Sequence, residues 1–526
     1  MTQNRVAAAI FILAVLLLLF GRLPSLSNDF CDPDLAGISY GARDLLAGGT
    51  IYDNCIETKP PGAYLIFATS FALFGRTLSP IYALAMLLHL AALLLLARLA
   101  RRQAGPMAAA FTALFYAVLA IDTAAAAGCP NYDTWMIIFV AFAVAACPVH
   151  DDRPAARRFA LTGVLIGVAF LMKQQAALFG LVLAVWIAAA PHGDRRAHLR
   201  SFGMFVLGGL APLLAIIAGW AMLGSLGTML TDLHPARLGG YVGAGADGQA
   251  LAAAWLRGQE HLAGAWPLWL AVAAGGALWL RNARWRDDFA RHLLLLVAAV
   301  GAVAAGSRFF NHYLIILAAP LALAAGSGVG LVDRLLGERR WRFAAYGALA
   351  LATLLASGTE LTQSAMSVRA WSRGDGPITG EMLVRFTRDD INLAERVDDR
   401  GIYRNLGAYI GSVTGEGETI YVWPYVPQVY FWADRFAPTK HYMYFDVAAA
   451  LPYKHGGWHA AASARVLTER RRLLRDLQTD RPRFVVLTRD PDSWDHAFTD
   501  LAQWVAENYV PDPKAPGEGL RVFRLP

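Results

Sequence analysis

Long apolar blocks constrain the fold of this chain more than any other feature of its sequence. A block of about 20 apolar residues is long enough to cross the hydrocarbon core of a bilayer. The first block covers residues 6–26 and reads VAAAIFILAVLLLLFGRLPSL. The later blocks cover residues 80–100, 106–125, 133–149, 159–172, 176–190, 202–223, 265–280, 292–305, 309–332 and 343–357. Together they predict a polytopic α-helical membrane protein of about eleven spans.

The composition agrees with a membrane protein. Of the 526 residues, 56% are hydrophobic and 17% are charged, whereas a soluble domain carries about a quarter charged residues. A cleaved signal peptide is the alternative for the first block. No small-x-small cleavage site follows the block, and many apolar blocks come later, so we expect an uncleaved first helix.

Arginines gather in alternate loops between the apolar blocks. The net charge of +7 would suit a nucleic-acid-binding protein, but this distribution is the one found in membrane proteins, whose cytoplasmic loops are the basic ones. The basic loops carry Arg98, Arg101 and Arg102; Arg153, Arg157 and Arg158; Arg195, Arg196 and Arg200; Arg281, Arg284, Arg286 and Arg291; and Arg334, Arg339, Arg340 and Arg342. The pattern predicts a cytoplasmic N-terminus, a C-terminus outside the cytoplasm, a place in a bacterial inner membrane, and no nucleic-acid partner.

Two outer loops are long, at residues 28–79 and 224–264. Within the first loop, GAYLIFATSFALFG (62–75) is apolar but short, and counting it as a span would invert every later loop. We therefore expect it to be an interfacial or re-entrant helix. The second loop contains the glycine-rich run RLGGYVGAGADGQA, which is typical of a mobile cover over a site.

The composition changes abruptly after residue 357, where the apolar blocks end. The segments ETIYVW, HYMYF, RFVVLT and LRVFRL have the composition of strands, and ASARVLTERRRLLRDLQTD has the period of an amphipathic helix. We expect a transmembrane catalytic domain over 1–357 and a soluble α/β domain over 358–526. The aromatic run YVWPYVPQVYFWADRFAPTKHYMYF is either core packing or a surface for sugars or membrane lipids.

The cysteines are few, and their placement suggests one bridge. Cys31 and Cys55 both lie in the first outer loop, on the oxidising side of a bacterial inner membrane. A Cys31–Cys55 disulfide is therefore a candidate, and two free buried thiols are the alternative.

Acidic residues crowd the first outer loop, which reads CDPDLAGISYGARDLLAGGTIYDNCIETKPPGAYLIF. Asp34 begins a segment with helical spacing over 35–47, so it is either a helix N-cap or a functional acid. Asp133 begins an apolar block after the second short outer loop and leaves the same two interpretations open. The secondary acidic candidates in the first loop are Asp32, Asp53 and Glu57.

Cations lie at the same outer ends of the apolar blocks. Lys59 follows the acidic run, and Lys173 lies between two apolar segments, where an ionisable residue is commonly functional unless it snorkels to the interface. Arg308 and His312 share one helix face, with Tyr313 beside them. Acids can receive a proton from a nucleophile, and cations can stabilise a phosphate leaving group. The set suits a substrate with a lipid tail and a phosphate head.

These motifs resemble a known family. Asp34 with ARDLLAGG, KPPGAYLIF and FALFG, and then Asp133 with GVAFLMKQQAALFG and RFFNHYLIILAAPLAL, are similar to bacterial GT-C glycosyltransferases related to protein O-mannosyltransferases. The lipid A aminoarabinose and galacturonic acid transferases belong to the same broader group. The resemblance covers most of residues 28–331, and its KPP and HY runs are specific in combination.

The resemblance implies an inverting transferase that uses a polyprenyl-phosphate sugar outside the cytoplasm. It implies that Asp34 activates the acceptor, that Lys59 lies near the donor phosphate, and that Asp133 is the second-loop acid. Arg308 and His312 match polar residues expected to bind phosphate. The resemblance leaves the acceptor open among a lipid, a glycan and a protein.

The chain departs from the family at its first acid. Relatives show Asp-Glu there, whereas Leu35 follows Asp34 and Asp32 precedes it. The spacing to ARDLL favours Asp34 over Asp32 as the base. Some members of the wider superfamily use a divalent cation, which Asp34 and Asp133 could hold through waters, and no other cofactor is expected.

A transporter or flippase of a lipid-linked glycan is the alternative function, because the same charges could line a pathway. Transporters usually show internal repeats with broken helices in matching halves, and we find no such symmetry in the sequence. A scaffold subunit that has lost activity is a third interpretation, and the retained acids and cations count against it.

Overall fold

A computed structural model describes most of the chain. It covers residues 3–27, 30, 33–55, 57–122, 128–148, 155–189, 195–234, 248–281, 286–305, 309–337, 341–373, 401–423, 426–443, 464–488, 498–517 and 519–526. Asp32, Arg308 and Cys31, which the sequence singled out, lie outside these ranges, as does most of the glycine-rich run of the second outer loop.

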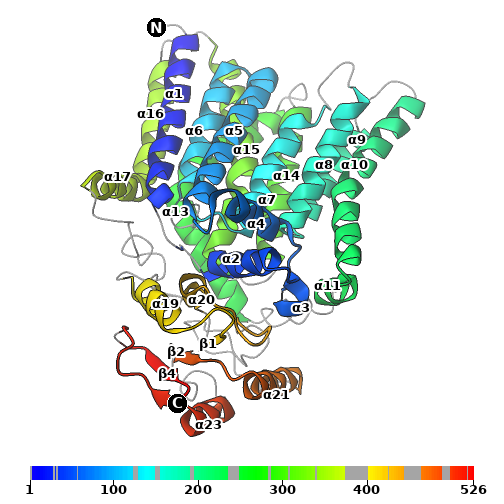
Figure 1. The fold of residues 1–526 in the computed structure, drawn as a ribbon. Helices are drawn as coiled ribbons and strands as arrows, with labels where there is room; N and C mark the ends of the chain where they lie inside the picture. Colours follow the sequence, from blue (N-terminus) through cyan, green and yellow to red (C-terminus); the bar gives the residue numbers. More distant parts are fainter. Residues whose placement is uncertain are drawn as a thin grey trace.

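Upright helices form the larger part of the molecule (Figure 1). In chain order they are α1 (Gln3–Arg22), α5 (Ser79–Ala104), α6 (Pro106–Ala120), α7 (Tyr132–Ala146), α8 (Ala156–Met172), α9 (Ala176–Ala189), α10 (Arg195–Met222), α13 (Gly248–Arg281), α14 (Arg286–Ala304), α15 (Ala318–Leu336) and α16 (Arg342–Ala356). The short 3-10 helices η1 (Leu23–Ser27) and η3 (Asn311–Leu317) extend α1 and precede α15. Each helix matches one of the apolar blocks.

The lengths of these helices bear on how many cross a membrane. Within the described ranges, five helices are long and apolar enough: Gln3–Arg22, Ser79–Ala104, Arg195–Met222, Ala254–Arg281 and Asn311–Leu336. Shorter apolar helices are Gly62–Phe74, Pro106–Ala120, Tyr132–Ala146, Ala176–Ala189 and Arg342–Ala356. The chain is thus a helical protein with several candidate spans, and the count of about eleven stays a prediction.

The first outer loop folds into three helices at one end of the upright bundle (Figure 1). They are α2 (Pro33–Leu46), α3 (Ile51–Asn54) and α4 (Gly62–Phe74). The helix expected over 35–47 is confirmed as α2, whose residues from Leu35 to Asp44 are buried. The second outer loop is more helical than its glycine content suggests, because α11 (Leu226–Asp232) follows α10 and α13 begins at Gly248.

The C-terminal part begins after α17 (Gly358–Arg373) and contains a small mixed sheet. The strands are β1 (Ile420–Trp423), β2 (Phe484–Leu487), β3 (Val510–Pro511) and β4 (Arg521–Arg524), in the order β1-β2-β4-β3. Ile420 pairs with Phe484 in the parallel β1–β2 ladder, and the other ladders are antiparallel. The helices are α19 (Ile402–Val413), α20 (Gln428–Ala433), α21 (Ala464–Thr479) and α23 (Thr499–Asn508).

The sequence predicted three of these strands and α21, but HYMYF is not a strand where the structure describes it. His441, Tyr442 and Met443 form a bend instead. The reason is packing: Tyr442 is buried against α2, and its neighbour His441 is buried beside α21, so the segment spans two partners instead of joining a sheet.

The C-terminal part docks on the first outer loop through α2 and α20. Arg43 of α2 donates to the Tyr430 carbonyl at 2.9 Å and lies 2.7 Å from the Asp434 carboxylate. Arg76, which follows α4, reaches the same carboxylate at 2.6 Å and the Phe431 carbonyl at 2.7 Å. Two arginines of the loop therefore hold the end of α20.

Helices α8 and α10 cross at glycines, as is common where membrane helices approach closely. A Cβ added at Gly208 would lie 2.1 Å from the Ala160 carbonyl oxygen, whereas one at Gly203 would meet nothing within 4 Å. We expect Gly208→Ala to lower the thermal midpoint of the purified protein, at a cost of about 1–3 kcal/mol for overpacking. Gly203→Ala, on the same helix, should leave the midpoint unchanged or raise it. Equal midpoints for the two variants would contradict this crossing.

Candidate active site

Asp133 lies at the start of α7, in its first turn. The N-cap is Asn131, whose side chain accepts from the Thr134 N–H at 3.2 Å. The Asp133 carboxylate is therefore not needed as a cap and is 2% exposed. The capping interpretation of Asp133 is wrong, and its charge needs another partner.

That partner is Lys173, at the break between α8 and α9. Its extended backbone (φ −158°, ψ 135°) ends α8, and its Nζ lies 2.7 and 2.9 Å from the two Asp133 carboxylate oxygens. Its Nζ also lies 3.9 Å from the ring centroid of Tyr313. Burial lowers the pKa of Lys173, and the Asp133 carboxylate opposes that shift. Lys173 is thus buried and paired, so it does not snorkel to the interface.

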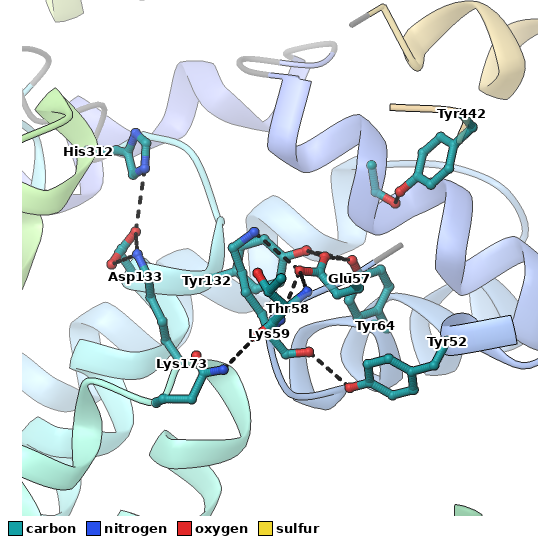
Figure 2. A network of polar contacts seen from close by, with 12 residues as sticks. Tyr52, Glu57, Thr58, Lys59, Tyr64, Tyr132, Asp133, Lys173, His312 and Tyr442 are labelled. Atoms are coloured by element: carbon teal, nitrogen blue, oxygen red, sulfur yellow. Dashed lines mark hydrogen bonds and ion pairs between the residues drawn. The ribbon is translucent and has the colours of Figure 1, made fainter. Parts of the chain in front are cut away.

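His312 adds a second nitrogen to this pair. Its Nε2 lies 3.7 Å from the Asp133 Oδ2, and its side chain is 23% exposed (Figure 2). The imidazole stacks on the Phe310 ring, with ring centroids 5.5 Å apart, and makes an edge contact with the Tyr313 ring, with centroids 4.8 Å apart. The His312–Tyr313 run of η3 therefore supplies an imidazole and an aromatic wall around the Asp133–Lys173 pair.

Lys59 approaches from the first outer loop. Its Nζ lies 4.4 Å from the ring centroid of Tyr132, the residue before Asp133, and 3.4 Å from the Glu57 carboxylate. Its side chain is 22% exposed, whereas that of Lys173 is 8% exposed. Each of the two ammonium groups thus lies against a tyrosine ring, and Lys59 is the more accessible of them.

The Glu57 carboxylate organises the turn that carries Lys59. It accepts from the backbone N–H of Thr58 at 2.7 Å and of Lys59 at 2.9 Å. It also accepts from the hydroxyl of Tyr132 at 2.9 Å and from that of Tyr64, on α4. The Glu57 carboxylate thus stabilises the turn through these hydrogen bonds, so we assign it a structural part in the site.

The remaining backbone groups of this turn are also held in place. The Tyr52 hydroxyl donates to the Lys59 carbonyl at 2.9 Å (Figure 2). The Gln174 side chain donates to the Thr58 carbonyl at 2.6 Å. The tyrosines at positions 52, 64 and 132 were not among the site residues predicted from the sequence. Two of them could have been found from their closeness to predicted site residues in the sequence, because Tyr132 directly precedes Asp133 and Tyr64 follows the KPP run by three residues.

Asp34 is the second residue of α2 and is partly buried. The Asp34 charge raises the pKa of Lys173, as the Asp133 charge does, whereas the charge of Lys59 lowers it. The Asp34 charge also acts on the pKa of Tyr442, which burial raises first. The Asp34 carboxylate therefore lies within electrostatic range of Lys173.

Two other predicted residues lie apart or differ. Asp53, on α3, is exposed and accepts from the hydroxyls of Thr50 and Ser225, so it joins α3 to the start of α11. Cys55 is a free, buried thiol, whereas Cys129 is disulfide-bonded. The candidate Cys31–Cys55 bridge is therefore wrong, because the Cys55 thiol is free and is packed among buried core residues.

The structure also bears on the predicted cation. Both oxygens of Asp133 accept hydrogen bonds from Lys173, so they are occupied. No group of three histidine, cysteine or acidic side chains suited to a metal is found in the part of the chain that the structure describes.

Two comparisons with known proteins, one by family and one by structure, each give a match. Residues 58–221, which include Lys59, Asp133 and Lys173, match the dolichyl-phosphate-mannose-protein mannosyltransferase family. The structure is similar to ArnT from Cupriavidus metallidurans bound to undecaprenyl phosphate, with 18% identity, a TM-score of 0.55, and 98% of this chain and 97% of that chain covered. This chain has the fold of GT-C glycosyltransferases. The resemblance found in the sequence is confirmed.

A second solved structure supports the same fold. It is the oligosaccharyltransferase AglB from Archaeoglobus fulgidus in complex with an inhibitory peptide and a dolichol-phosphate, at 12% identity and a TM-score of 0.54. The match covers 97% of this chain and 73% of AglB. No curated protein sequence matches the chain.

The buried pair at the centre of the site allows a test of stability. We expect Lys173→Met to destabilise the protein by about 3–5 kcal/mol, because it leaves the buried Asp133 carboxylate without its hydrogen-bonded ammonium partner. Adding Asp133→Leu should recover part of the loss, as measured by thermal unfolding in detergent. Glu260→Gln, which removes an exposed i,i+3 pair with Arg257, is the control and should change little. An additive double variant would argue against the pairing.

Proposed function

We propose that this protein is a membrane glycosyltransferase that moves a sugar from a polyprenyl-phosphate donor to an acceptor outside the cytoplasm, with inversion. The observation that carries the proposal is the pair of lysines, Lys59 and Lys173, held by aromatic rings around Asp133 at the end of the bundle. Two similar structures, ArnT bound to undecaprenyl phosphate and AglB in complex with a dolichol-phosphate, support this class of donor.

In this proposal the lysines and His312 bind the donor phosphate. Lys59 is 22% exposed, so a phosphate oxygen can approach its ammonium group. Lys173 is held in place by Asp133, and its ammonium group adds to the positive potential of the site. Fixed cations aimed at a leaving group stabilise the charge that develops there, and they do so more strongly where water is scarce.

Asp34 acts as the general base. Its carboxylate takes the proton from the acceptor nucleophile, whose electron pair then forms a bond to the anomeric carbon. The bond from that carbon to the phosphate oxygen breaks, and its electron pair leaves with the polyprenyl phosphate. Attack opposite the leaving group inverts the anomeric centre. Asp34 is suited to this part because Asp133 is already committed to Lys173, and Glu57 to its turn.

The orientation follows from the arginine pattern. We propose that the site and the C-terminal part face the periplasm of a bacterial inner membrane, so that the transferase modifies a cell-envelope acceptor such as lipopolysaccharide, another glycan or lipid, or a protein.

We expect Asp34→Asn to lower sugar transfer by about 10²–10⁴-fold, because the amide cannot accept the proton. Membranes charged with radiolabelled polyprenyl-phosphate sugars measure the transfer at matched expression. Asp53→Asn is the control, since that carboxylate binds Ser225 and lies apart from the lysines. Equal transfer by wild type and Asp34→Asn would refute Asp34 as the base and point to Asp32. Movement of the lipid across the bilayer without sugar transfer would favour a transporter.

A further inference from the structure

A short segment of the C-terminal part reaches α2 close to Asp34. We call residues 439–443 the strap. The Tyr442 ring lies flat on the Tyr40 ring, with centroids 3.9 Å apart and planes 8° apart. The Tyr442 hydroxyl donates to the Gly37 carbonyl at 3.3 Å. Gly37 is one helical turn from Asp34, so the strap contacts the turn of α2 that carries the proposed base.

The other side of the strap is tied to α21. The Thr439 hydroxyl donates to the Asp476 carboxylate at 2.7 Å, and the His441 Nε2 lies 3.3 Å from the Glu469 carboxylate. The side chains of His441 and Glu469 are buried, at 0% and 7% exposure. The strap is therefore anchored in the C-terminal part before it reaches α2.

Glycines on α2 allow this close approach. A Cβ at Gly37 would lie 2.8 Å from the Met443 sulfur and 3.4 Å from the Tyr442 hydroxyl. A Cβ at Gly41, one turn further along, would lie 2.6 Å from the ring of Tyr64. One glycine-lined face of α2 thus receives a tyrosine from the C-terminal part and a tyrosine from α4.

This face also connects the base to the lysine turn. Tyr64 donates to Glu57, whose carboxylate holds the backbone of Lys59. The burial of Tyr442 raises its pKa, and the nearby charges of Glu57 and Asp34 raise it further, so its hydroxyl keeps its proton as a donor. Tyr442 therefore lies within electrostatic range both of the proposed base and of the carboxylate that holds the Lys59 turn.

We propose that Tyr442 is a positioning residue, through which the C-terminal part fixes the first turns of α2 and the Asp34 carboxylate relative to Lys59. The inference rests on the proposed function for its effect on catalysis, but its effect on α2 is independent of that function. Misplacing a reacting group by an ångström can cost about 10²-fold in rate, so the strap should influence turnover more than binding of the donor.

The test combines turnover with hydrogen exchange. Tyr442→Leu removes the stack on Tyr40, and we expect kcat to fall about 10–100-fold while KM for the polyprenyl-phosphate sugar changes less than about threefold. Tyr442→Phe keeps the ring and should restore most of kcat. The amides of α2 should exchange faster in Tyr442→Leu than in wild type. This readout needs no activity, so it separates a failure of the inference from a failure of the proposed function.

The control is Tyr509→Leu. Tyr509 is buried in the same part of the chain and donates to the Pro482 carbonyl at 2.8 Å, away from α2. It should leave kcat and α2 exchange unchanged. If Tyr442→Leu does not fold, Gly37→Val tests the same contact, because its side chain would press on Met443 and Tyr442. Unchanged α2 exchange, an equal loss of kcat in Tyr509→Leu, or a rise in KM alone would overturn the inference.

Discussion

The candidate site depends on the buried ion pair between Lys173 and Asp133. Each charge alone would be costly at this depth, where water is scarce. Together they join the start of α7 to the break between α8 and α9. Each oxygen of the Asp133 carboxylate accepts a hydrogen bond from the Lys173 Nζ. The pair also separates the parts that we propose for the acids: Asp133 is the partner of a cation and Glu57 holds a turn, whereas Asp34 is the acid that we propose for proton transfer.

Much of the bundle could be predicted from the sequence, because apolar length and helical period are local properties. The apolar blocks match the observed helices, and the spacing over 35–47 gives α2. The residues Asp34, Lys59, Asp133, Lys173 and His312 were also candidates from their positions at the outer ends of these blocks. Their electrostatic grouping in the structure agrees with that choice, although their catalytic parts stay proposals.

The misses come from contacts between distant parts of the chain. Tyr442 looked like part of a strand, but it stacks on Tyr40, some 400 residues earlier in the sequence. The cysteine proposal paired two residues of one loop, whereas Cys55 is buried as a free thiol. Asp133 looked equally suited to capping, and only the position of Asn131 decides against it. No local pattern encodes such pairings.

The most direct test of the account is whether the lysine cluster recognises a lipid-linked phosphate. Binding of undecaprenyl phosphate and of undecaprenol to the purified protein would be titrated for wild type and for Lys59→Met. The account predicts that wild type binds the phosphate at least about tenfold more tightly than the alcohol, and that Lys59→Met loses most of this difference. Equal affinity of wild type for the two lipids would contradict the account.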